Sequence, residues 1–183
     1  MTKETQSQVG LWKNKRPNAV EWINHVFNGA LREQALEFVE WAHEMGFKLK
    51  IHSTTNNGHN VFYNKEYMCK ILINKADDDK LAYWTIEPCL SNMKNYEKII
   101  ENEGLADLPW KPNSCIHTKQ PDKTKINNTC NACPVKGVDR LAFGKEFTKC
   151  CVVFPKIKNP GEAEINRIKR LLMLEKTARD NKK

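Results

Sequence analysis

Residues 47–73 read FKLKIHSTTNNGHNVFYNKEYMCKILI, and this stretch decides the fold. Apolar and polar side chains alternate over residues 47–52, which is the period of a half-buried β-strand. The Asn-Asn-Gly triplet at 56–58 is typical of a turn. Two further apolar segments lie on either side of Asn64-Lys65, and this arrangement indicates a hairpin. The stretch therefore predicts three consecutive strands joined by short turns.

A fourth strand is expected at residues 81–86, after an Asp-rich turn. Strands that follow one another through short turns pair antiparallel, whereas parallel strands need a long crossover. We therefore expect an α+β fold in which an antiparallel meander sheet of about four or five strands is packed by helices near 30–45 and 160–175. The β-prone residues within 147–157 could return to the same sheet.

Both long helices carry recognisable end signals. An apolar stripe at helical spacing predicts the first one, and Gly46 stands where its C-terminal cap belongs. Asn159, Pro160 and Glu162 fit the cap, the first-turn proline and the capping-box acid of the last helix. Shorter helices are expected just before the first long helix and after the fourth strand.

The chain of 183 residues is most simply one domain with extensions. We expect a flexible arm at 1–16 and a single α+β domain at 17–175. This domain would include a Cys-rich excursion at 105–151, and a charged tail would follow at 176–183. A loop as long as this excursion is uncommon in a compact domain unless something orders it.

Composition narrows the class of protein. The formal charge of +8 arises from 30 Lys and Arg against 22 Asp and Glu, but the lysines are spread along the chain, which favours a solvated surface over a nucleic-acid partner. No apolar run reaches the ~18–20 residues that cross a bilayer. The polar start, residues 1–10, lacks the apolar core of a signal peptide, so we expect a cytoplasmic protein with no membrane partner. In a reducing compartment, clustered cysteines are more often metal ligands or redox groups than disulfides.

The Cys-rich excursion holds five of the seven cysteines, and these give the clearest chemical signal. Four thiolates from three points along the chain suit a tetrahedral Zn²⁺. The cofactor expected is therefore Zn²⁺, and an iron–sulfur cluster fits less well because the spacing matches neither common ferredoxin run. The predicted zinc ligands are Cys115, Cys130, Cys133 and Cys150, any one of which Cys151 or His117 could replace.

Other interpretations of the cysteines stay open. Cys130 and Cys133 form a C-x2-C followed by Pro134, which resembles some redox motifs but lacks their parallel β-α-β context. All five could also be small buried hydrophobes with free thiols, and we expect this core role for Cys69 and Cys89.

No catalytic signature is present, so the sequence leaves open whether the chain is an enzyme. Trp84 and Trp110 could line a pocket for a flat, apolar ligand, although core packing also explains them. His52 and His59 flank the Asn-Gly turn and could face each other across a hairpin as a second metal site.

The order of these motifs resembles small bacterial α+β proteins of the YdhG-like group. The likeness covers about residues 30–175 and is specific mainly at Cys130 to Pro134 and Phe143 to Cys150. The resemblance implies a compact α+β domain whose cysteines belong to a site, and it implies no activity.

The leading functional hypothesis is a non-enzymatic, zinc-containing binding protein that recognises a small molecule or a macromolecule. One alternative is a thiol-based redox enzyme or sensor that uses Cys130 and Cys133. Another is a nucleic-acid-binding module that uses the basic last helix and the zinc-bound segment.

Overall fold

The computed structural model describes residues 17–52, 57–75, 81–114, 138–142 and 145–181, and of these it describes the backbone alone for 111–114, 138–142 and 145–154. The backbone groups into two compact units. The first unit comprises Met1–Ile86 and Ile157–Ile165, and the second comprises Glu87–Lys156 and Asn166–Lys183.

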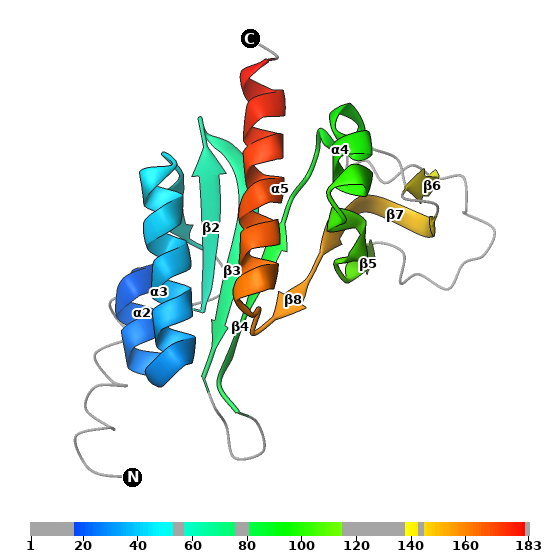
Figure 1. Ribbon diagram of the computed structural model, residues 1–183. Coiled ribbons are helices and arrows are strands. Elements are labelled where there is room, and N and C mark those ends of the chain that lie inside the picture. Colours follow the sequence, from blue (N-terminus) through cyan, green and yellow to red (C-terminus); the bar gives the residue numbers. More distant parts are fainter. Residues whose placement is uncertain (1–16, 53–56, 76–80, 115–137, 143–144, 182–183) are drawn as a thin grey trace, which may run out of the picture. The chain divides into compact units, whose positions relative to one another are not determined.

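The first unit contains the predicted meander. Five strands form one antiparallel sheet in the order β1-β2-β3-β4-β8, so the α+β class and the meander are confirmed (Figure 1). Four strands are consecutive in the chain, and a short fifth strand returns from near the C-terminus to pair with β4. The strands are β1 (Lys48–Ile51), β2 (Gly58–Tyr63), β3 (Glu66–Asn74), β4 (Tyr83–Pro88) and β8 (Ile157–Lys158).

The turn between β2 and β3 explains how this sequence forms a tight hairpin. Asn64 and Lys65 connect the two strands, and both have positive φ, at 48° and 69°. Two consecutive residues with positive φ form the type I′ turn, whose twist matches that of the flanking strands. A bulge beside Val61 adds one residue to β3, and as a result Met68 and Cys69 are both fully buried.

Two helices cover one face of this sheet: α2 (Ala19–Val26) contacts β3, and α3 (Gly29–Glu44) contacts β1 (Figure 1). The two helices also pack against each other. Phe38 of α3 lies against Trp84 of β4, with ring centroids 6.0 Å apart, and both side chains are fully buried. The helices therefore define a covered face of the sheet, and the strand residues that alternate with the buried ones form its other face.

The second unit contains a separate sheet that the sequence did not predict. Three strands pair antiparallel in the order β5-β7-β6. They are β5 (Trp110–Ser114), β6 (Val138–Ala142) and β7 (Lys145–Pro155). The predicted return to the first sheet is thus made by β8, whereas most of 147–157 belongs to β7 of the second sheet.

Helical segments complete the second unit. The short helices after the fourth strand are η1 (Met93–Asn95), α4 (Glu97–Asn102) and η2 (Leu105–Asp107). The last helix, α5 (Glu162–Asp180), begins in the first unit and continues in the second. It extends past Lys176, where the sequence predicted a fraying tail, and Arg179 near its end is buried.

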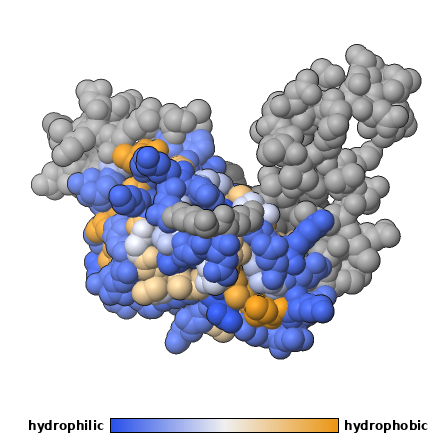
Figure 2. Space-filling model, turned by 90° about the horizontal axis from the view of Figure 1, so that it is seen from above, coloured by the Kyte–Doolittle hydropathy of each residue, from blue (hydrophilic) through white to orange (hydrophobic). Residues whose placement is uncertain are grey.

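The face of the molecule seen in Figure 2 is mainly hydrophilic among the described residues. In Figure 2, hydrophobic residues reach the surface in separate patches surrounded by polar side chains. Among the described residues, no helix is both long and apolar enough to cross a membrane.

Candidate functional site

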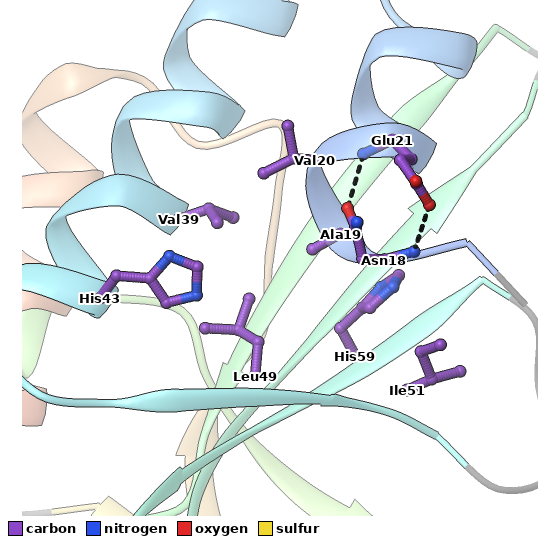
Figure 3. Close-up of a pocket in the computed structure, with 9 residues that line it drawn as sticks. All are labelled: Asn18, Ala19, Val20, Glu21, Val39, His43, Leu49, Ile51 and His59. Carbon is purple, nitrogen blue, oxygen red and sulfur yellow. Dashed lines mark hydrogen bonds between the residues drawn. The ribbon is translucent and has the colours of Figure 1, made fainter.

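A cavity of about 330 Å³ lies in the first unit, between the start of α2, the C-terminal half of α3, the edge strand β1 and its neighbour β2 (Figure 3). This volume falls within the range of small-molecule sites, which are mostly apolar with a few placed polar groups. Five of its nine lining side chains are apolar. The lining residues are Asn18, Ala19, Val20, Glu21, Val39, His43, Leu49, Ile51 and His59.

The alternation of the strands directs these side chains into the cavity. Leu49 and Ile51 are two residues apart on β1 and therefore point to the same face. Cross-strand pairing places Ile51 opposite His59 of β2, so this histidine joins the same face. The face is the one covered by α2 and α3, because Val39 and His43 of α3 line the cavity from the other side.

His59 is the polar group at the base of this cavity, and it is only 1% exposed. Its Nε2 lies 3.3 Å from the backbone oxygen of Pro17. Because a carbonyl oxygen can only accept a hydrogen bond, this contact assigns the ring proton to Nε2. Nδ1 is then an unprotonated acceptor, and within the described part of the chain it has no hydrogen-bond partner.

Burial determines the charge of this ring. Removal from water lowers the pKa of His59 below its ordinary value, and the hydrogen bond to Pro17 offsets this only in part. The imidazole is therefore neutral near pH 7, which preserves the free lone pair on Nδ1. A buried acceptor without a partner costs about 1–3 kcal/mol, so this geometry favours an additional donor.

The other polar groups of the cavity are either paired with each other or exposed. Asn18 Oδ1 accepts a hydrogen bond from the backbone N–H of Glu21 at 2.9 Å, and the Glu21 carboxylate accepts one from the Asn18 N–H at 3.0 Å. This reciprocal pair is the capping box that begins α2. Val20 and His43 are exposed and mark the side on which the cavity meets solvent.

The nine lining residues include no Ser, Thr, Cys, Lys or Tyr, and their ionisable side chains are Glu21, His43 and His59. The arrangement can enclose an apolar body and offer one acceptor nitrogen to it.

A second buried titratable group, Glu175 of α5, lies in the second unit and is 0% exposed. Both of its carboxylate oxygens accept hydrogen bonds, the shortest of them from the Tyr96 hydroxyl at 2.6 Å. Arg179 Nε donates to the same carboxylate at 2.8 Å. Burial alone would raise the pKa of Glu175, but these hydrogen bonds outweigh it, so the pKa lies below its ordinary value. The remaining donors are Ser91 Oγ and the backbone and side-chain nitrogens of Asn92.

The predicted zinc ligands lie mostly outside the part of the chain that the structure describes. Cys115, His117, Cys130 and Cys133 lie outside the described residues, and for Cys150 and Cys151 only the backbone of β7 is described. In the residues that the structure does describe, no group of three or more His, Cys, Asp or Glu side chains could hold a metal ion. The zinc site therefore stays a prediction.

Both tryptophans predicted to line a pocket are buried. Trp84 is fully enclosed in the first unit, against Phe38. Trp110 is buried in the second unit, where its Nε1–H donates to the backbone oxygen of Leu105 at 3.1 Å. Neither lines the cavity of Figure 3. Of the two cysteines expected in the core, Cys69 is fully buried and Cys89 is half-buried.

The predicted pairing of His52 with His59 is wrong. The register places Ile51 opposite His59, whereas the His52 N–H donates to the backbone oxygen of Gly58. A shift of one residue sends these two side chains to opposite faces of the sheet. The same alternation could have revealed the cavity, since it predicts His59 on the face of Leu49 and Ile51 once the turn is placed correctly.

Comparisons with known proteins give no further constraint: no family model matches the chain, and neither the curated proteins nor the solved structures contain a significant match.

Proposed function

We propose that this chain is a non-enzymatic binding protein whose cavity takes a small, neutral and largely apolar molecule with one hydrogen-bond donor. The observation that supports this most strongly is the unpartnered Nδ1 of His59 at the base of an apolar cavity. A hydroxyl or an amide N–H on the ligand would satisfy this nitrogen, and the apolar body would contact Val39, Leu49 and Ile51.

The cavity disfavours both negatively and positively charged ligands. An anion would meet the lone pair of Nδ1 and the nearby Glu21 carboxylate. A cation would have to leave water for an apolar enclosure. Neutral donors such as alcohols, phenols and amides therefore fit best.

Phenol and its methyl ether, anisole, test this proposal because they share the ring and differ in the donor. Titration followed by two-dimensional NMR should show tighter binding of phenol to the wild-type chain. A hydrogen bond to a buried acceptor contributes about 1–1.5 kcal/mol, which corresponds to about a fivefold to tenfold preference. His59→Leu should remove this preference while leaving the cavity apolar.

His25→Leu is the matched control, since His25 is on α2 but does not line the cavity. That variant should keep the preference for phenol. Equal binding of phenol and anisole to the wild type, or a preference that survives His59→Leu, would contradict the proposal.

We further propose that the cysteine-rich segment holds one structural zinc ion. The backbone pairing of the second sheet supports this, because Cys150 on the central strand β7 lies opposite Ser114 of β5 and Val138 of β6. Ser114 directly precedes the proposed ligand Cys115 in the sequence. Four protein ligands would close the coordination sphere and leave no open position for catalysis.

Elemental analysis of untagged protein, purified without chelator, tests the zinc proposal. We expect about one zinc per chain, as one tetrahedral site requires. Cys133→Ser should lose it, whereas Cys89→Ser, outside the segment, should retain it. Metal-free protein with freely reactive thiols would contradict the proposal and favour the redox alternative at Cys130 and Cys133.

A further inference from the structure

The first unit has a second sheet face, opposite the one covered by α2 and α3, and its side chains form a distinct surface. The register pairs Lys48 with Phe62 and Lys50 with Asn60, so these four share one face. They alternate with Leu49 and Ile51, which point into the cavity, so they lie on the other side. Asn60 pairs in turn with Lys70, and Phe62 with Tyr67, which extends this face across β3.

The same face continues over β4 and β8. Trp84 points toward α3, so its neighbours Tyr83 and Thr85 point away from the helices. Thr85 pairs with Lys158, whose ammonium lies 4.0 Å from the centre of the Tyr83 ring. We call this surface the lysine–aromatic face; it consists of Lys48, Lys50, Asn60, Phe62, Tyr67, Lys70, Tyr83, Thr85 and Lys158.

Cations and aromatic rings alternate on this face. The Lys50 ammonium lies 5.5 Å from the centre of the Phe62 ring, and Phe62 meets the Tyr67 ring edge-on at 6.0 Å. Tyr67 is 36% exposed, and Lys48, Lys50 and Lys158 are also exposed. The lysine heads thus rest over the rings, from which they can swing outward without disturbing the backbone.

The charge on this face is mainly positive. Four lysines contribute to it, while the acidic residues of the five strands are Glu66 and Glu87. Glu87, two residues after Thr85 on β4, shares this face, and its carboxylate is paired with Lys156 at 2.6 Å. Glu66 pairs with Tyr63, which contacts Phe47 and so lies toward the covered face. The face therefore presents positive charge beside flat rings, a combination that suits phosphates and bases together.

Two polar atoms on the same face lack hydrogen-bond partners among the described residues, namely Asn60 Oδ1 and Thr85 Oγ1. Both atoms are buried, and Thr85 as a whole is only 3% exposed.

We propose that the lysine–aromatic face binds single-stranded nucleic acid. Bases would stack on Phe62, Tyr67 and Tyr83, and the phosphates would pair with the displaced lysines, as expected where a sheet face presents rings to unpaired bases. Five strands at about 4.8 Å spacing span about 19 Å, which leaves room for a few nucleotides. The rings require unstacked bases, so a duplex should bind more weakly. This inference does not depend on the cavity, which lies on the other side of the sheet.

Fluorescence anisotropy with a short labelled oligothymidylate or oligouridylate tests the proposal on the full chain. Phe62→Ala should weaken binding about 5- to 150-fold, the range typical for loss of one stacked base. The double variant Lys50→Gln/Lys70→Gln should weaken binding and reduce the slope of log affinity against log salt by about 1.4, because each phosphate contact contributes about 0.7. Its matched control is Lys94→Gln/Lys98→Gln, two exposed lysines of the second unit with the same change in charge.

The comparison of the Lys50/Lys70 and Lys94/Lys98 double variants decides between specific and general binding. Loss of affinity and of salt slope only in the Lys50/Lys70 variant supports the proposal, and circular dichroism confirms that each variant remains folded. Equal losses in both pairs would show general charge attraction and overturn it. Binding of a duplex as tight as that of the single strand, or binding of anionic lipid vesicles without binding of oligonucleotide, would also overturn it.

Discussion

Two buried titratable groups in this molecule have opposite surroundings. Glu175, in the second unit, has both carboxylate oxygens hydrogen-bonded, including to Arg179 and Tyr96. His59, in the first unit, is as deeply buried but keeps one ring nitrogen without a partner in the described chain. Folding gives hydrogen-bond partners to both carboxylate oxygens of Glu175 but to only one of the two ring nitrogens of His59.

The difference separates a structural role from a binding role. A buried polar group stabilises a fold when it is paired, and it costs free energy when it is not. Glu175 therefore needs nothing beyond the chain itself. His59 gains a partner only if another molecule supplies one, and the adjacent cavity provides the space for it.

The largest loss of stability should come from replacing Glu175. Glu175→Gln keeps the shape but leaves the buried Arg179 charge without its carboxylate, so we expect a loss of about 3–5 kcal/mol in the free energy of unfolding. Urea denaturation measures this loss. Glu162→Gln, at an exposed position of the same helix, is the control and should cost less than about 1 kcal/mol. A loss of stability for Glu175→Gln as small as that of the control would contradict the distinction between Glu175 and His59.

A much smaller change in stability is expected when His59 is replaced. His59→Leu removes one long hydrogen bond but also an unpartnered nitrogen, so stability near pH 7 should change by about 1 kcal/mol or less. The pH dependence should change more clearly. The pKa of His59 is lowered on folding, so the unfolded chain binds a proton below about pH 6.5 while the folded chain does not.

Stability of the wild type should therefore fall as the pH drops from about 6.5 toward the lowered pKa of His59. His59→Leu should make this decline shallower in urea denaturation series across that range. His25, whose pKa is also lowered by burial, accounts for part of the remaining decline. An unchanged slope in His59→Leu would mean that the ring is already solvated.

The smallest loss of stability is expected at an exposed ion pair. It tests whether burial, rather than ion pairing itself, makes Glu175 important for stability. Arg170 and Glu103 form a two-bond ion pair at 2.8 and 2.6 Å, but both side chains are exposed. Exposed pairs contribute little, so Arg170→Ala should cost about 0.5 kcal/mol in thermal or urea unfolding. A loss comparable to that of Glu175→Gln would contradict this distinction.

Much of the first unit was predictable because its signals are local. Strand alternation, the Asn64-Lys65 turn and the apolar stripe of α3 each depend on a few neighbouring residues. The strands β5 and β6 carry no such alternation, and their pairing with β7 joins segments far apart in the sequence. This long-range pairing explains why the Cys-rich excursion at 105–151 is predicted from the sequence as a long loop.

The candidate site was harder to predict for the same reason. His59 could be placed on a strand, but its partner Pro17 and the α3 wall come from distant parts of the chain. The end of α5 shows a similar limit. Its charged sequence predicted fraying, whereas contacts of Glu175 with residues 91–96 bury this segment.

The most direct test of the central claim is nitrogen-15 NMR of the His59 ring with and without phenol. We expect a neutral ring protonated at Nε2, with an Nδ1 resonance that shifts on addition of phenol and not of anisole. A ring protonated at Nδ1, or an Nδ1 resonance that phenol leaves unchanged, would contradict it.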